Sequence, residues 1–234
     1  MFHFKKFSID DGKAAMKVGT DAVLLGAWVK CGNETRILDI GTGSGILALM
    51  MAQRNKAVAI DAVEIDHDAA ELARQNFLLS PWAQQISIYN ETIQEFALHT
   101  ESRYSLIVCN PPFFTGSLKT PGKARNLARH NDSLPVTELL DITASLLSEK
   151  GKAAFIIPFD AYEHWQQEAE KRNLFPSHAT IVKSSPTHKP HRVMIEFTSV
   201  KQTGTNESEL NIYQSEKKYS FDYQALTKDF YLNF

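Results

Sequence analysis

The sequence has few cysteines and no long apolar runs. Cys31 and Cys109 are the only thiols among 234 residues. Both have apolar neighbours, and two thiols cannot form a disulfide framework or a cysteine zinc site by spacing, so we expect buried thiols. No unbroken apolar run has membrane-spanning length, and the start MFHFKKFSID lacks the apolar core of a secretory signal. We therefore expect a cytoplasmic protein with no membrane partner.

An excess of charge of one sign is also missing. The 25 lysines and arginines are offset by 27 acids, which gives a net charge of −2. This balance argues against a protein that coats nucleic acid without specificity, so any contact with nucleic acid must be local. The scattered histidines do not share the spacing of metal ligands, and we expect no metal site. A chain of this length fits one domain with a sizeable core.

Short β-branched runs alternate with longer helical patterns along most of the chain. The last two runs are joined only by SPTHKP, which is too short for a parallel crossover, so we expect a terminal hairpin and one antiparallel strand. The polar stretch 201–209 is expected to be a surface loop before a short terminal strand and helix. Strands are predicted at 35–41, 57–65, 85–90, 104–110, 151–158, 177–184 and 191–200, and helices at 46–55, 67–79, 135–149 and 160–173.

These elements predict a single domain in three parts. Residues 1–34 form a helical lead-in, 35–200 form a Rossmann-like α/β core, and 201–234 form a C-terminal extension. The core is expected to be a largely parallel sheet with helices on both faces.

A glycine-rich loop follows the first core strand in LDIGTGSGILAL, residues 38–49. Gly41, Gly43 and Gly45 let the backbone turn sharply and let a ligand approach main-chain amides. Glu64 ends the next strand, where its carboxylate could accept hydrogen bonds from two ribose hydroxyls. A tight strand-to-helix turn is the alternative for the loop taken alone, and Glu64 makes a nucleoside-binding site the better interpretation. The spacing differs from G-x-G-x-x-G, which disfavours a dinucleotide.

The stretch NPPFF, residues 110–114, ends the fourth core strand. Asn110 offers a carbonyl acceptor, and Pro111 lacks an N–H and restricts Asn110 to extended conformations. Pro112 fixes the direction of the Pro111 carbonyl, so two carbonyls are placed to accept both hydrogens of one planar amino group. Phe113 could stack on the ring that carries this group. These four residues are the predicted catalytic residues, and a proline-rich turn is the alternative.

The glycine loop resembles the first motif of class I S-adenosylmethionine-dependent methyltransferases. That resemblance implies a seven-stranded sheet in the order 3-2-1-4-5-7-6. N-P-P-F after the fourth strand resembles enzymes that methylate a planar nitrogen. The stretch KVGTDAVLLGAW, residues 17–28, and the stretch from Asn110 to His130 resemble the bacterial valine-tRNA adenine-N6 methyltransferase family. This similarity extends over nearly the whole length of the chain. The resemblance implies S-adenosylmethionine as the cofactor, a tRNA anticodon stem-loop rather than DNA as the partner, and Asp39, Gly41, Thr42, Gly43, Gly45 and Glu64 as cofactor-binding residues.

The residues after the motif favour RNA. The stretch 113–131 contains no acid, and it carries the predicted RNA-binding residues Lys119, Lys123, Arg125, Arg129 and His130. A second acid-free stretch, 176–195, carries Lys183, Lys189 and Arg192, and for it a solvated face is an equal alternative.

Other points stay open at this stage. Many relatives carry an acid near the cofactor adenine where this chain has Thr92, next to Glu91. Asp21 could cap the helix that follows it, which we favour, or face the cofactor. Methylation of an rRNA guanine-N2 or of a protein glutamine amide, and a noncatalytic RNA-binding protein, are the alternative functions. A glutamine methyltransferase would need an N-terminal helical domain, for which about 35 residues before the first core strand are too few. The oligomeric state is open, with a monomer as the expectation.

Overall fold

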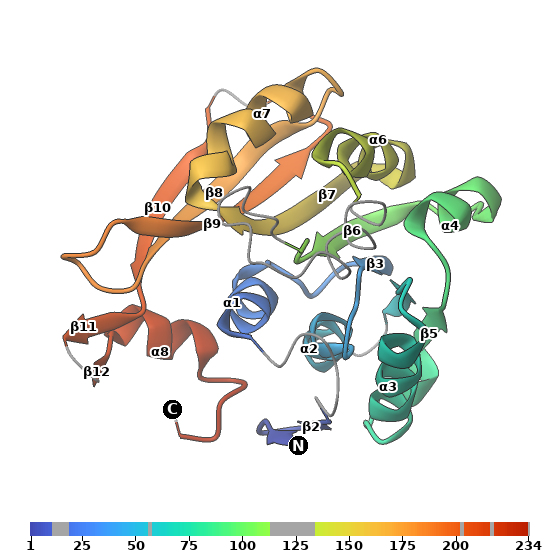
Figure 1. Cartoon of the computed structure of the whole chain (residues 1–234), viewed down its shortest axis with the longest axis horizontal. Coiled ribbons are helices and arrows are strands. Elements are labelled where there is room, and N and C mark those ends of the chain that lie inside the picture. Colours follow the sequence, from blue (N-terminus) through green and yellow to red (C-terminus); the bar gives the residue numbers. More distant parts are fainter. Residues whose placement is uncertain (11–18, 56–57, 113–133, 202–203, 216–217, 234) are drawn as a thin grey trace, which may run out of the picture.

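A mixed β-sheet forms the centre of the protein in the computed structural model, which describes residues 1–10, 19–55, 58–112, 134–201, 204–215 and 218–233 (Figure 1). Within these residues the sheet has eight strands in the order β10-β8-β9-β7-β6-β3-β4-β5. The strands are β3 (Arg36–Ile40), β4 (Ala59–Val63), β5 (Ile86–Tyr89), β6 (Tyr104–Cys109), β7 (Leu147–Pro158), β8 (Phe175–Lys183), β9 (Pro190–Thr198) and β10 (Asn206–Asn211). Strand β9 alone runs antiparallel to its neighbours β7 and β8.

The predicted fold class is confirmed, with one correction to the sheet. The order 3-2-1-4-5-7-6 and the antiparallel strand of the terminal hairpin are present, but β10 adds an eighth strand parallel to β8. Residues 206–209 of the predicted surface loop 201–209 therefore belong to a strand. Its polar side chains have partners at the sheet edge: Glu209 pairs with Lys183 at 2.8 Å, and the Ser208 and Thr180 hydroxyl groups are 2.8 Å apart.

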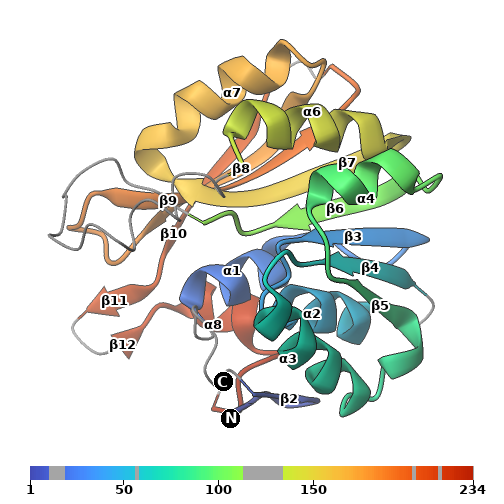
Figure 2. The ribbon, with the colours of Figure 1, turned by 45° about the vertical axis from the view of Figure 1, so that its right-hand side comes forward.

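Helices cover both faces of the sheet (Figure 2). One face carries α1 (Thr20–Trp28), α2 (Ile46–Arg54), α3 (His67–Leu78) and α8 (Phe221–Thr227), and the other carries α4 (Ile93–His99), α6 (Val136–Leu146) and α7 (Tyr162–Glu170). Two hydrophobic clusters fill these two layers. None of the helices in the described ranges has the length and apolar character needed to cross a membrane.

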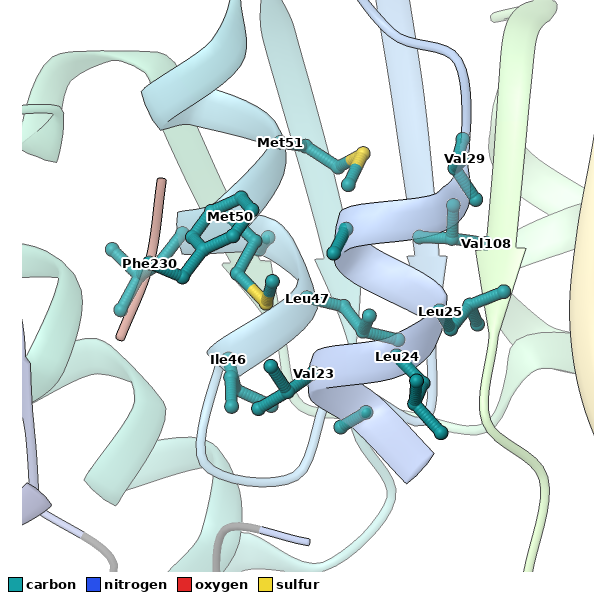
Figure 3. Close-up of a cluster of buried hydrophobic side chains, with 14 of the residues drawn as sticks. Val23, Leu24, Leu25, Val29, Ile46, Leu47, Met50, Met51, Val108 and Phe230 are labelled. Carbon is teal, nitrogen blue, oxygen red and sulfur yellow. The ribbon is translucent and has the colours of Figure 1, made fainter. Parts of the chain in front are cut away.

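Helix α1 packs closely against α2 in the first of these layers (Figure 3). A side chain at Gly26 would place its Cβ 2.5 Å from the Met50 sulfur, so glycine allows the two helices to approach. Phe230 lies against Met50 on the other side of α2 and is 2% exposed. The helix cluster therefore includes residues from the last part of the chain.

The two ends of the chain lie side by side (Figures 1 and 2). The predicted helical lead-in 1–34 is corrected here, because it begins with a small hairpin of β1 (Phe2–His3) and β2 (Ser8–Ile9) and is helical, in its described part, only at α1. The Lys5 N–H donates to the Phe230 carbonyl at 2.8 Å, and Phe4 stacks near Tyr231. A second small sheet, β11 (Tyr213–Ser215) with β12 (Lys218–Tyr219), connects β10 to α8.

Candidate active site

A cavity of about 1020 Å³ opens at the carboxyl ends of β3 and β6. The two strands pair in parallel with Ile40 opposite Cys109, so Gly41 and Asn110 follow them at the same level of the sheet. This is the edge of an open α/β sheet where ligands bind. The described lining comes from β1, the start of α1, the glycine loop with the start of α2, the N-P-P motif, the start of β9 and the C-terminal extension.

The three glycines of the loop have different structural roles. All three have positive φ angles, of 67° at Gly41, 57° at Gly43 and 89° at Gly45. A Cβ at Gly41 or Gly43 would meet nothing within 4 Å, so open space lies where a ligand could approach the backbone. A Cβ at Gly45 would instead lie 2.3 Å from the Phe77 ring. Gly45 thus permits α3 to pack against the loop, which the sequence spacing did not distinguish from ligand binding.

Asp39 holds the loop from beneath. Its Oδ2 accepts hydrogen bonds from the Thr42 hydroxyl at 2.6 Å and from the Ala48 N–H at 3.1 Å. Its Oδ1 is buried and has no hydrogen-bond partner among the described residues. Burial raises the pKa of this carboxyl to about 7, although the two hydrogen bonds act in the opposite direction. Asp39 and Thr42 therefore shape the glycine loop.

Glu64 lies at the end of β4, where the sequence predicted a ribose acceptor. Its Oε2 accepts from the Gly43 N–H at 2.8 Å and its Oε1 accepts from the Asp66 N–H at 3.0 Å. A carboxylate has about four lone-pair positions, so both oxygens keep acceptor capacity for a ligand. The Asn90 carboxamide donates to the Glu64 carbonyl at 2.9 Å and fixes this turn. Asn90 was not among the predicted site residues, although an Asn directly after a strand is a signal for such a bond.

Asn110 has an unsatisfied acceptor. Its Oδ1 is buried and lacks a hydrogen-bond partner within the described residues, and Asn110, Pro111 and Pro112 all line the cavity. A buried carbonyl without a donor is costly, so such a group in an enzyme cavity is matched to a ligand donor. Phe113 and the basic residues Lys119, Lys123, Arg125, Arg129 and His130 lie outside the described residues.

Two cations of the second acid-free stretch, 176–195, form ion pairs with acids from other elements of the fold. Lys183 pairs with Glu209 at 2.8 Å, and Arg192 pairs with Asp21 at 2.8 Å, so acids from other elements neutralise both cations.

The α1 N-cap is Gly19 with no side-chain cap, so the favoured capping role of Asp21 is wrong. Asp21, His191 and Arg192 line the same cavity as Asn110. Only the fold brings these three residues together, because 170 positions separate Asp21 from His191 and 171 separate it from Arg192.

Thr92 has a local structural partner. Its side chain accepts from the Glu95 N–H at 3.1 Å, and the Glu95 carboxylate accepts from the Thr92 N–H at 3.0 Å, which is a capping box at the start of α4. Glu91 is bonded to His99 at 2.9 Å. The T-x-x-E spacing is a sequence signal for α4, which was not among the predicted helices.

Comparisons with known proteins agree with this geometry. Residues 13–134 match the family model "Methyltransferase small domain". The chain is 44% identical over 234 residues to a tRNA1(Val) (adenine(37)-N6)-methyltransferase of Flavobacterium psychrophilum, which covers 99% of both chains. It is 46% identical over 233 residues to the protein of that name from Phocaeicola vulgatus, covering 99% of this chain and 97% of the relative.

Solved structures share the fold. A predicted O-methyltransferase from Agrobacterium tumefaciens aligns with a TM-score of 0.67 at 14% identity, over 90% of this chain and 96% of that one. TrmN from Thermus thermophilus aligns with a TM-score of 0.54 at 18% identity, over 76% of this chain and 48% of that one. At this level of identity the alignments establish the fold alone. From its full-length relatives and the matched domain, the chain belongs to the family of tRNA1(Val) (adenine(37)-N6)-methyltransferases, within the methyltransferase small domain family.

Proposed function

We propose that this protein transfers the methyl group of S-adenosylmethionine to the exocyclic N6 of adenine 37, next to the anticodon of valine tRNA. The buried Asn110 Oδ1 without a partner is the observation that carries this proposal. An adenine amino group supplies the N–H donor that this oxygen lacks. The glycine loop opens into the same cavity, so cofactor and amine would meet there.

The open backbone at Gly41 and Gly43, with the Glu64 carboxylate beside it, fits the cofactor. S-adenosylmethionine supplies an electrophilic methyl group on a sulfonium centre. The glycine loop and Glu64 would hold its nucleoside part, and Asp39 keeps the loop in position through Thr42 and Ala48.

Asn110 and Pro111 orient the amine. The lone pair of an aromatic amine is shared with its ring, which makes the nitrogen a weak nucleophile. Two carbonyls that accept both hydrogens help to turn the lone pair toward the methyl carbon, and this positioning lowers the barrier. With S-adenosylmethionine bound, the oriented nitrogen would form the N–C bond as the C–S bond breaks, and S-adenosylhomocysteine would be the second product. The methylated nitrogen then loses one proton to solvent.

The RNA side of the proposal rests on the acid-free segment that follows the motif. Lys119, Lys123, Arg125, Arg129 and His130 would contact phosphates of the anticodon stem-loop. An anticodon-loop base is unpaired, so it enters a pocket at little cost in stacking. This substrate implies that the enzyme acts in the cytoplasm.

Single-turnover methylation of a valine-tRNA transcript tests the proposal. The expected product of the parent enzyme is N6-methyladenosine, and a transcript with guanine at position 37 should stay unmodified. Asn110→Ala should slow the methyl-transfer step roughly 10²-fold to 10³-fold, because it removes an acceptor that acts mostly in the transition state. Asn110→Asp keeps an acceptor and should retain more activity.

Asn33→Ala is the matched control, since Asn33 is exposed and precedes β3 at the opposite end of the strand from the cavity. It should react like the parent. Full activity of Asn110→Ala would contradict the role of the carboxamide. Methylation of guanine in total RNA, or of a protein glutamine, would favour one of the alternative substrates.

A further inference from the structure

Three tyrosine rings of the C-terminal extension form a nearly parallel stack. Tyr213 of β11 lies on Tyr219 of β12 with ring centroids 4.9 Å apart and planes 19° apart. Tyr219 lies on Tyr223 of α8 at 5.0 Å and 18°. We call Tyr213, Tyr219 and Tyr223 the tyrosine stack. Stacked rings at this spacing form a rigid aromatic surface.

The inner end of this stack is anchored. Tyr223 is 2% exposed and belongs to the hydrophobic cluster of α1, α2 and α8. Burial and a hydrogen bond to Tyr231 raise the pKa of Tyr223, which keeps its hydroxyl neutral. Tyr213 at the other end is half-buried, and among the described rings it contacts Tyr219 alone. The Tyr213 end is therefore the place where a further aromatic ring could extend the stack.

The tyrosine stack borders the cavity of the candidate active site. Its three rings line the cavity together with Asn110 and the glycine loop. The volume of about 1020 Å³ lies at the upper end for a ligand pocket, which leaves room for more than the cofactor. The stack follows β10 at one edge of the sheet, whereas Glu64 follows β4 near the other edge (Figure 1). The aromatic surface is thus distant in the sheet order from the predicted ribose site.

The charges around this surface suit a phosphodiester chain. Asp21 is the single acid in the described lining, and Arg192 neutralises it at 2.8 Å. A lining of aromatic rings with no unpaired carboxylate accepts a nucleobase without repelling its phosphates. Proteins bind unpaired bases by stacking them on such rings.

We propose that the tyrosine stack binds an unpaired nucleobase adjacent to the target adenine of the RNA substrate, with this base stacked at the Tyr213 end. The proposal rests on the proposed function, because the neighbouring base is defined by the adenine that Asn110 would hold. It assigns the C-terminal extension a role in positioning RNA.

Binding of a fluorescent anticodon stem-loop RNA and single-turnover methylation test this assignment together. Tyr213→Ala should weaken RNA binding roughly 5-fold to 150-fold, the range for loss of one stacked base. Tyr213→Trp keeps an aromatic face and should bind like the parent. Cofactor affinity should stay at the parent value in both variants, and the loss of methylation in Tyr213→Ala should appear mainly as a higher KM for the RNA rather than as a lower kcat. Phe221→Ala is the control, since Phe221 is an exposed aromatic residue of the same extension that is absent from the described cavity lining.

An RNA series with one abasic nucleotide on either side of the adenine completes the test. The abasic site at the stacked position should weaken binding by the parent and have no further effect on Tyr213→Ala. Equal losses in both proteins at both positions, or loss of cofactor binding in Tyr213→Ala, would overturn the proposal. RNA binding that depends on Tyr213 but without methylation of adenine would refute the proposed function and keep the tyrosine stack as an RNA site. A parent protein that does not bind the RNA would refute both.

Discussion

The three glycines of the loop have different roles, since Gly41 and Gly43 leave space for a ligand and Gly45 allows close packing. The same residue type stands at Gly41, Gly43 and Gly45, yet only Gly45 contacts a core side chain at the position of a Cβ. Sequence spacing identified the loop but could not assign these roles, because Phe77 reaches the loop from another helix. Substitutions at Gly43 and Gly45 should therefore affect ligand binding and the free energy of unfolding to different degrees.

Gly45→Ala should destabilise the fold more than Gly43→Ala. The new methyl group at Gly45 would clash with the buried Phe77 ring, so we expect a loss of about 2 to 4 kcal/mol from overpacking and the left-handed backbone. Gly43→Ala has only the backbone cost, about 1 kcal/mol, but it fills ligand space and should weaken S-adenosylmethionine binding. Urea denaturation and calorimetric titration measure the two effects. Equal unfolding midpoints for both variants would contradict the packing role.

Asp39 should make the stability of the ligand-free protein depend on pH. Burial raises its pKa from 3.8 to about 7, so between these values the folded state holds a proton that the unfolded state releases. The stabilisation that protonated Asp39 contributes is fully present below the unfolded-state pKa of 3.8. It is lost as pH rises toward 7, by at most about 1.4 kcal/mol per pH unit. Asp39→Asn should remove this part of the slope in urea midpoints measured from pH 5 to 8. Asp68→Asn is the control, since Asp68 is exposed, and it should keep the pH dependence of the parent. An unchanged pH dependence in Asp39→Asn would count against the shifted pKa.

At the scale of elements, alternating apolar runs were enough to predict seven strands and the terminal hairpin, whereas the strand order was implied by the resemblance to class I methyltransferases. In the central sheet and the two helix layers of the described residues, β10 and α4 were missed for different reasons. Strand β10 has the sequence NESELN, and only Leu210 of it is buried, so its pairing depends on backbone bonds to β8 and on edge partners such as Lys183. Helix α4 has seven residues, which is too short for a clear period, and its capping box was the available signal. Local sequence predicts elements that are long enough to show the period of a buried face, and misses an edge strand that depends on distant partners or a helix too short to show a period.

A chain of hydrogen bonds links three elements around β8. The Trp28 indole N–H of α1 donates to the Thr180 hydroxyl at 2.7 Å, and this hydroxyl lies 2.8 Å from that of Ser208 in β10. Thr180→Val keeps the shape but leaves the indole N–H without its acceptor, so we expect a loss of about 1 to 3 kcal/mol in unfolding free energy. Ser208→Ala keeps the Trp28 bond and should cost less. Urea titration distinguishes the two, and equal losses would show that the Trp28 bond contributes little.

At the scale of the whole molecule, the C-terminal extension is part of the core. Phe230 packs against Met50, and its carbonyl accepts the Lys5 N–H. Phe230→Ala should lower the free energy of unfolding by about 3 to 5 kcal/mol and keep a single transition. Tryptophan fluorescence and circular dichroism in urea should shift together. An early transition seen by one probe, with the main transition unchanged, would show that the extension unfolds as a separate unit.

The contact between the two ends of the chain also has a consequence during synthesis on the ribosome. The Lys5 N–H cannot meet the Phe230 carbonyl until residue 230 has left the exit tunnel, although the glycine loop and the N-P-P motif emerge much earlier. The nascent chain therefore displays its catalytic motifs before the wall of the cavity that contains Tyr213 exists. A ribosome that stalls after the motifs would hold a chain with every predicted catalytic residue and an unfinished cavity.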